Sequence, residues 1–346
     1  MTTGDLSTLL VWAATTALTI ALVAWTVDLA AVAERAQGRA RRATAARTPV
    51  AVGAAEPADD SLADPAPVTG TAGPDGTAAG SPRAQGIARM TTYLGALLLL
   101  AGVALRGVAS GRWPTANMYE FTIVGVLVAV SVLAVVQRRR PIAFVGVVVL
   151  GIAVLALALG LLVFFVQADA VQPALDSYWL IIHVGVAIIA TGVFTVAFAA
   201  SVLQVLRDVR AAGPREVDGP ARRTDALRRW VLGPRFAWLE QVPGPRELEA
   251  LAFRLNAIGF VLWTFTLIGG AIWAEHAWGR YWGWDPKEVG TFVAWVVYAA
   301  YLHARTTRGW SGRRAAYFVF VGYAVVLANF TVVNLFVDGK HAYSGL

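Results

Sequence analysis

The sequence predicts an all-α fold: a polytopic membrane bundle of about eight transmembrane helices, with both termini outside the cytoplasm. Of its 346 residues, 57% are hydrophobic and only 15% are charged. Soluble domains carry about 25% charged residues. The apolar residues occur in long blocks, several of which reach the roughly 20 residues that a helix needs to cross a bilayer. Lys and Arg gather in alternate loops between these blocks, as is typical of multi-pass proteins.

Eight apolar segments are long enough to be spans. The first, Leu6 to Ala33, lacks a basic segment before it and a clear small-residue cleavage site after it, so we interpret it as a retained helix rather than a signal peptide. The other seven are Met90 to Ala109, Tyr119 to Val136, Pro141 to Val166, Tyr178 to Leu206, Phe253 to Ala274, Glu288 to Arg305 and Ala315 to Val337.

The distribution of basic residues predicts the orientation. Of the 29 Lys and Arg side chains, 23 lie in loops on one side and five lie on the other. The rich side is expected to be cytoplasmic. The net charge of +7 is then a consequence of topology, and binding to nucleic acid is not expected.

Composition divides the chain into three regions. Residues 1–33 form the N-terminal transmembrane helix, and residues 34–89, rich in Ala, Pro, Gly and Asp, are predicted to be a disordered cytoplasmic linker. Residues 90–346 form a seven-helix membrane domain. It contains a cytoplasmic loop at 207–252, where a short amphipathic helix on the membrane surface is expected, and an outer Trp-rich loop at 273–288.

The outer loop is unusually aromatic. Its first twelve residues hold four tryptophans and a tyrosine: Trp273, Trp278, Tyr281, Trp282 and Trp284. An interfacial aromatic belt is one interpretation, although a belt needs only one or two aromatic residues per helix end. The other is a stacking platform for an aromatic macrocycle, because indole faces offer large flat contact areas.

Four histidines are the candidate metal ligands, since the chain has no cysteine. By topology, His183 and His341 lie on the same side as the Trp-rich loop, whereas His303 lies near the cytoplasmic end of its span. His276 lies within the Trp-rich loop and is interpreted as a polar loop residue. The alternatives to metal binding are a hydrogen bond from His183 to a backbone carbonyl, a solvated side chain for His341, and a contact of His303 with lipid phosphate.

The Trp-rich loop carries a recognisable signature, Trp278-Gly-x-x-Trp282-x-Trp284-Asp285-x-Lys287-Glu288. It resembles the "WWD" signature of haem-handling proteins, and within them the CcsA/ResC family of system II cytochrome c biogenesis, whose members are called CcsB in some actinobacteria. The resemblance extends from about Met90 onward. Its weaker flanking pieces are Trp113 to Glu120, Ser177 to His183, Leu302 to Arg305 and Gly339 to Ser344.

The resemblance implies a haem-binding subunit of a holocytochrome c synthase, also called a cytochrome c haem-lyase. Haem b is its non-covalently bound substrate, with iron held by His183 and His341 on the outer face. The tryptophans Trp278, Trp282 and Trp284, together with Asp285, would position the haem. The residues themselves suggest that Lys287 or Arg280 pairs with a haem propionate.

The same resemblance implies a route and partners. Haem would enter at a second, inner site, with His303 as one ligand and the other from a CcsB/ResB-type membrane partner. It would then be attached at the outer face to the Cys-x-x-Cys-His peptide of apocytochrome c, whose thiols explain why this chain needs none. The isolated chain is expected to be inactive.

Two other classes of function fit the same pattern. A haem transporter or delivery protein would use the tryptophan platform without catalysing attachment. A cytochrome b-type electron carrier would bind haem between histidines of a helical bundle and react with quinol. A plain multi-pass transporter is less consistent with the sequence, which shows neither a duplicated half nor a substrate signature.

Overall fold

The structure is a computed structural model that describes residues 1–47, 81–139, 142–168, 177–213 and 223–341. Within these ranges the chain is helical and forms no strand. The elements are α1 (Thr3–Arg47), α2 (Pro82–Ser110), α3 (Met118–Arg139), α4 (Ala143–Leu162), α5 (Tyr178–Ala211), α6 (Arg223–Leu232), the 3₁₀ helix η2 (Pro234–Gln241), α7 (Pro245–Trp278), α8 (Pro286–Thr307), α9 (Arg313–Phe330) and α10 (Val332–Phe336). The predicted all-α polytopic bundle is confirmed.

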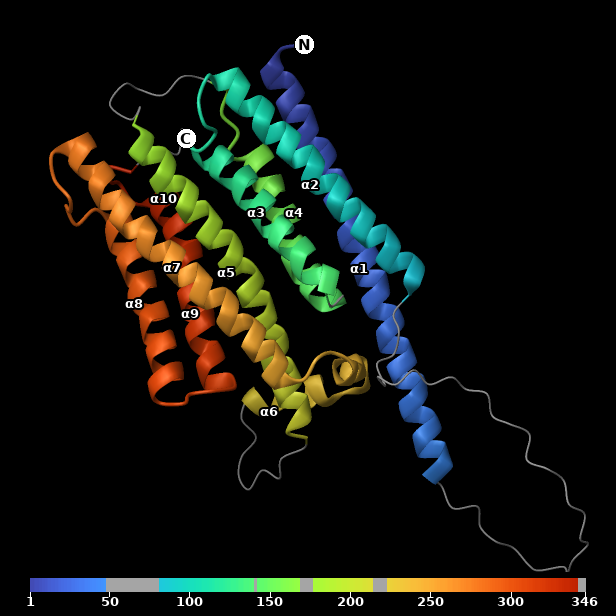
Figure 1. Cartoon of the computed structure of the whole chain (residues 1–346). Coiled ribbons are helices and arrows are strands. Elements are labelled where there is room, and N and C mark those ends of the chain that lie inside the picture. Colours follow the sequence, from blue (N-terminus) through green and yellow to red (C-terminus); the bar gives the residue numbers. More distant parts are fainter. Residues whose placement is uncertain (48–80, 140–141, 169–176, 214–222, 342–346) are drawn as a thin grey trace, which may run out of the picture.

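Seven of the described helices are long and apolar enough to cross a membrane: α1 to α5, α7, and α9 together with α10. The eighth expected span, Glu288 to Arg305, coincides with α8. This helix is not apolar enough to be counted with the other seven. Its 22 residues give a length of about 33 Å, so length does not separate it from the others. The difference is the polar content: Tyr298, Tyr301 and His303 interrupt its apolar sequence. Figure 1 shows α8 running beside α7 and α9.

Two groups of helices form the bundle (Figure 1). In the first, α1 packs against α2 and α4, and α3 packs against α4. In the second, α5 packs along α7 and α9, and α8 packs against α9. Helix α5 joins the groups through its contacts with α3 and α4.

Close approach in the second group depends on small residues and flat rings. The rings of Phe194 in α5 and Tyr298 in α8 stack with centroids 4.0 Å apart and planes 4° apart. On α7, a Cβ at Gly259 would lie 2.5 Å from the Phe194 ring, so only glycine fits there. Dense van der Waals contact of this kind is a main source of helix association in a bilayer, where lipid tails are as apolar as the side chains.

The boundaries of the expected linker change. Helix α1 continues to Arg47 and α2 begins at Pro82, so helix covers both ends of the 34–89 segment, and residues 48–80 lie outside the described residues. Asp28 of α1 is only 1% exposed and accepts hydrogen bonds from the Ser81 amide (2.7 Å) and from Nε2 of Gln85 (3.2 Å). One carboxylate in α1 therefore fixes the start of α2.

The loop expected at 207–252 contains α6 and η2, in agreement with the short helix predicted there. Trp230 of α6 is 56% exposed. Arg210 at the end of α5 donates to the carbonyls of Val231, Leu232 and Gly233. This contact attaches the short helix to the bundle. The location of the segment on the membrane surface, like the side of the membrane on which the termini lie, stays a prediction.

A buried ionic cluster joins three segments at one end of the bundle. Glu120 at the start of α3 is fully buried and pairs with Arg106 of α2 (3.0 Å) and with Arg112 (2.7 Å). Arg106, itself 1% exposed, also donates to the carbonyls of Val166 (2.7 Å) and Gln167 (3.1 Å), beyond the end of α4. The carboxylate and the carbonyls together satisfy the buried guanidinium, as a buried charge requires.

We expect Glu120→Gln to destabilise the protein by about 3–5 kcal/mol, because it leaves the buried Arg106 without its charged partner. Thermal unfolding of the detergent-solubilised protein, monitored by size-exclusion chromatography, measures the loss of stability. Glu240→Gln is the matched control: Glu240 pairs with Arg210 but is 61% exposed. The control should cost less than about 1 kcal/mol. An equal loss of stability in the two variants would contradict the prediction that the buried ion pair stabilises the protein more than the exposed one.

Candidate functional site

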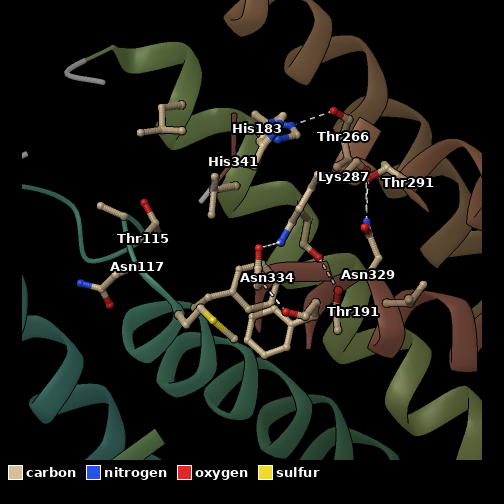
Figure 2. Close-up of a pocket in the computed structure, with 18 of the residues that line it drawn as sticks. Thr115, Asn117, His183, Thr191, Thr266, Lys287, Thr291, Asn329, Asn334 and His341 are labelled. Atoms are coloured by element: carbon tan, nitrogen blue, oxygen red, sulfur yellow. Dashed lines mark hydrogen bonds between the residues drawn. The ribbon is translucent and has the colours of Figure 1, made fainter. Parts of the chain in front are cut away.

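The structure brings two of the four histidines to one cavity (Figure 2). His183 lies in the second turn of α5, and its Nδ1 is 2.8 Å from the carbonyl oxygen of Thr266 in α7. His341 follows α10, and its Nδ1 is 2.7 Å from Oδ1 of Asp285. Trp273 contacts both rings, with centroid distances of 6.3 Å to His183 and 5.6 Å to His341.

The hydrogen bonds determine which ring nitrogen of each histidine can bind a metal. A backbone carbonyl only accepts, so Nδ1 of His183 carries the hydrogen and donates it to Thr266. The Asp285 carboxylate likewise accepts from Nδ1 of His341. In both rings Nδ1 is engaged, so Nε2 is the nitrogen that would bind a metal, and the hydrogen bond at Nδ1 orients the ring and raises its basicity.

Asp285 connects the start of α8 with the C-terminal tail. Its side chain caps α8 by accepting from the Lys287 amide (3.1 Å), and Glu288 completes a capping box. The same carboxylate accepts from the Lys340 amide (2.6 Å) and from His341. One side chain thus holds both a helix terminus and a candidate ligand.

These contacts keep Asp285 ionised. Burial by itself raises the pKa of the Asp285 carboxyl, but the hydrogen bonds from His341, Lys340 and Lys287 outweigh it and lower the pKa from 3.8 to about 2. Because the pKa is lower in the folded state, the stabilisation is fully present above pH 3.8 and is lost as the pH falls through about 2. The Asp285–His341 pairing is therefore intact at neutral pH.

The Trp-rich segment is more helical than the sequence indicates. Helix α7 continues to Trp278 and ends at Gly279, whose φ of 68° lies in the left-handed region that favours glycine. The connecting loop is therefore shorter than the predicted 273–288. Among the described residues, Trp284 is the only non-glycine residue with a positive φ, 58°. Glu288 supports this conformation, because its Oε2 accepts from the amides of Gly283 (2.8 Å) and Asp285 (3.0 Å).

The three tryptophans of the signature lie in different surroundings. Trp278 contacts His341 edge to face, with centroids 4.9 Å apart. Trp282 lines a smaller cavity that both histidines also line. Trp284 is 76% exposed, contacts Trp282, and lines neither cavity. Two of the three predicted platform residues are therefore close to the histidines.

The inner part of the main cavity is polar, although helices surround it. The Lys287 ammonium donates to Oδ1 of Asn334. Nδ2 of Asn329 donates to Oγ1 of Thr291 (2.9 Å) and to the carbonyl oxygen of Lys287 (3.3 Å) (Figure 2). The cavity has a volume of about 960 Å³ when the part open to solvent is counted.

The two predicted cationic residues of this region differ. Lys287 lines both cavities, and its ammonium lies beside the space that the histidines face. The Arg280 guanidinium instead lies against the backbone of Gly283, where a Cβ would overlap it, and Arg280 lines neither cavity.

The other two histidines lie elsewhere. His303 is exposed on α8, 16 residues beyond Lys287, which corresponds to about 24 Å along the helix. His276 is exposed on α7, where its Nδ1 donates to the carbonyl oxygen of Ile272 (2.8 Å), and it lines neither cavity. The structure therefore separates His303 from the His183–His341 pair, as the sequence predicts.

Several site residues were not identified from the sequence. Asn329 and Asn334 gave a usable signal, because polar residues are rare within an apolar span and usually face a cavity. Thr266 gave none, because it acts through its backbone carbonyl, a group that every residue has.

Comparisons with known proteins identify the family of the chain. A model of the cytochrome C assembly protein family matches residues 114–341, more than half of the chain and the region that holds both histidines. The cytochrome c biogenesis protein CcsA of Synechococcus sp. (strain CC9902) is 33% identical over 270 residues, covering 75% of this chain and 86% of that protein. The CcsA protein of Mesostigma viride is 32% identical over 265 residues, covering 73% of this chain and 83% of the relative.

A solved structure shares the fold. The cytochrome c haem lyase CcmF superimposes with a TM-score of 0.59 at 16% sequence identity, covering 95% of this chain and 47% of CcmF. The chain thus spans about half the length of CcmF, and at this identity the likeness is one of fold alone. The family match and the CcsA relatives carry the assignment: the chain belongs to the CcsA family of cytochrome c biogenesis proteins and acts in cytochrome c maturation.

Proposed function

We propose that this protein binds haem b as a substrate between His183 and His341. It presents the haem for attachment to the Cys-x-x-Cys-His peptide of apocytochrome c at the outer face of a bacterial plasma membrane. The observation that carries the proposal is the pair of imidazoles on one cavity, each with Nδ1 hydrogen-bonded so that Nε2 is the nitrogen that would bind iron. Two axial histidines are a common ligation of haem iron.

In this proposal the chain acts by positioning. Thr266 and Asp285 orient the two imidazoles, and Trp273, Trp278 and Trp282 supply aromatic surface around the macrocycle. Attachment itself is an addition: each client thiol forms a carbon–sulfur bond to one vinyl carbon, and its hydrogen goes to the other. Holding vinyl and thiol together replaces a bimolecular encounter, a large part of what an enzyme can contribute.

We further propose that Lys287 pairs with a haem propionate. Lys287, Asn334 and Asn329 form a polar part of the cavity wall, so a macrocycle bound there would direct its carboxylates toward these residues. Charge-assisted hydrogen bonds between ammonium and carboxylate are among the strong ones in a water-poor site.

The inner part of the route is also a proposal. His303 is exposed on α8 and far from the other histidines, so a second haem there would need its other ligand from another chain. A CcsB/ResB-type membrane partner would supply that ligand, and the haem would move from there to the outer cavity.

We expect His183→Ala and His341→Ala each to abolish the six-coordinate, low-spin spectrum of bound haem, because each removes one axial ligand. Absorption spectra of the purified protein, oxidised and reduced, measure this. His276→Ala is the matched control and should keep the wild-type spectrum, since His276 lines neither cavity. Retention of the low-spin spectrum in both ligand variants would refute the assignment.

Substitution of the cations tests the propionate contact. Lys287→Gln should weaken haem binding by about tenfold, in line with the loss of one charge-assisted hydrogen bond. It should have no effect on binding of haem dimethyl ester, which lacks the carboxylates. Arg280→Gln should leave both affinities unchanged. Titration of the haem-depleted protein gives the affinities, and an equal loss for haem and its ester would count against a carboxylate contact.

Activity requires a separate test. Co-expression of the chain with a ResB-type partner and an apocytochrome c should yield covalent c-type haem, detected by haem staining of denatured protein. We expect the chain without the partner to yield none. A complex that fills with haem but leaves the apocytochrome unmodified would favour a delivery protein over a synthase, and product from the single chain would contradict the need for a partner.

A further inference from the structure

The two histidines of the cavity are held in different ways. His183 belongs to α5, a helix of 34 residues that packs along α7. The backbone of α7 lies against it: a Cβ at Gly270 would be 2.7 Å from Cε1 of His183, and one at Gly269 would be 3.6 Å from its Cα. Displacing His183 would therefore require two long helices to move apart.

His341 lies on a non-helical tail. Helix α10 has only five residues and ends at Phe336. The tail backbone runs directly over Asp285, where a Cβ at Gly339 would lie 2.8 Å from Oδ2. Two hydrogen bonds then reach this carboxylate, from the Lys340 amide (2.6 Å) and from the His341 ring (2.7 Å).

The position of Asp285 allows these two bonds to break without leaving a bare buried charge. The same carboxylate caps α8 through the Lys287 amide, at the end of the helix where the dipole favours negative charge. When the tail leaves, this interaction remains. The tail is thus attached to a residue that keeps a hydrogen bond to its own helix when the tail is absent.

We propose that the two ligands have unequal roles: His183 stays on the iron, and His341 is the ligand that the client histidine replaces. Asp285 is the positioning residue that controls release of His341. This inference rests on the proposed function, because it assumes haem between the two histidines. In the exchange, the bond from iron to Nε2 of His341 breaks and a bond from iron to the client imidazole forms. Both ligands are neutral, so no electron or proton is transferred.

The rate at which carbon monoxide binds to the reduced, haem-loaded complex tests this. Carbon monoxide needs a vacant position on the iron, so at saturating concentration the observed rate equals the rate at which a histidine dissociates. Asp285→Asn retains the cap of α8, because Asn is as good an N-cap as Asp, but it removes the charge. We expect this variant to bind carbon monoxide about tenfold faster, corresponding to the weakening of a charge-assisted hydrogen bond by about 1.4 kcal/mol.

A second variant reaches the same contact from the tail. Lys340→Pro removes the amide hydrogen that Asp285 accepts and leaves the carboxylate in place. It should speed carbon monoxide binding by about threefold to tenfold, the effect of one lost hydrogen bond. Glu275→Gln is the matched control, because Glu275 is an acidic residue of α7 that lines neither cavity. Its rate should equal that of the wild type.

The outcomes separate this inference from the proposed function. If the wild-type haem is not six-coordinate with two histidines, the proposed function itself fails. If it is, and both variants bind carbon monoxide at the wild-type rate, His183 is the ligand that dissociates and the inference is overturned.

Hydrogen exchange in the haem-free chain gives an independent readout. In Asp285→Asn the Lys340 amide should exchange about tenfold faster while the first turn of α8 keeps its protection, because only the tail contact is weakened. Unchanged exchange at Lys340 would also overturn the inference.

Discussion

The hydrocarbon core of a membrane requires every backbone amide and carbonyl to be bonded within the protein, and this constraint determines where chemistry can occur in this molecule. In the middle of a long helix every backbone group is hydrogen-bonded. At each end, four amides or four carbonyls lack a helical partner. The candidate site is assembled where α5 and α8 begin and where α7 and α10 end. Asp285 shows how the two needs combine, since one carboxylate completes the α8 terminus and orients His341.

The interior below this end is specialised in two different ways. Between α5, α7 and α8 the packing is tight, with Phe194 against Tyr298 and a glycine where α7 passes. Around Lys287 the helices instead leave a cavity with a polar part, in which asparagines of the last helices meet a threonine of α8. Rigid packing fixes the geometry of the helix ends above it, and the cavity supplies the space that a bound molecule needs.

Apolar length predicts most of the helices, because the bilayer imposes that length directly. Glu288 to Arg305 differs from the other predicted spans, because its tyrosines and its histidine make the helix less apolar. At the site, His183 and His341 were identified from topology and family resemblance. The carbonyl of Thr266, the orientation of Arg280 over Gly283 and the exposure of Trp284 follow from backbone paths that no residue type specifies.

The contact between Asp28 and the start of α2 has a consequence for the long connection between the first two helices. Their register is set by a buried carboxylate that accepts from the Ser81 amide, together with side-chain packing, and not by the number of residues that separate them. The first helix is therefore held in the bundle by contacts of its own with the start of α2, and a substitution of Asp28 would loosen both helices at once.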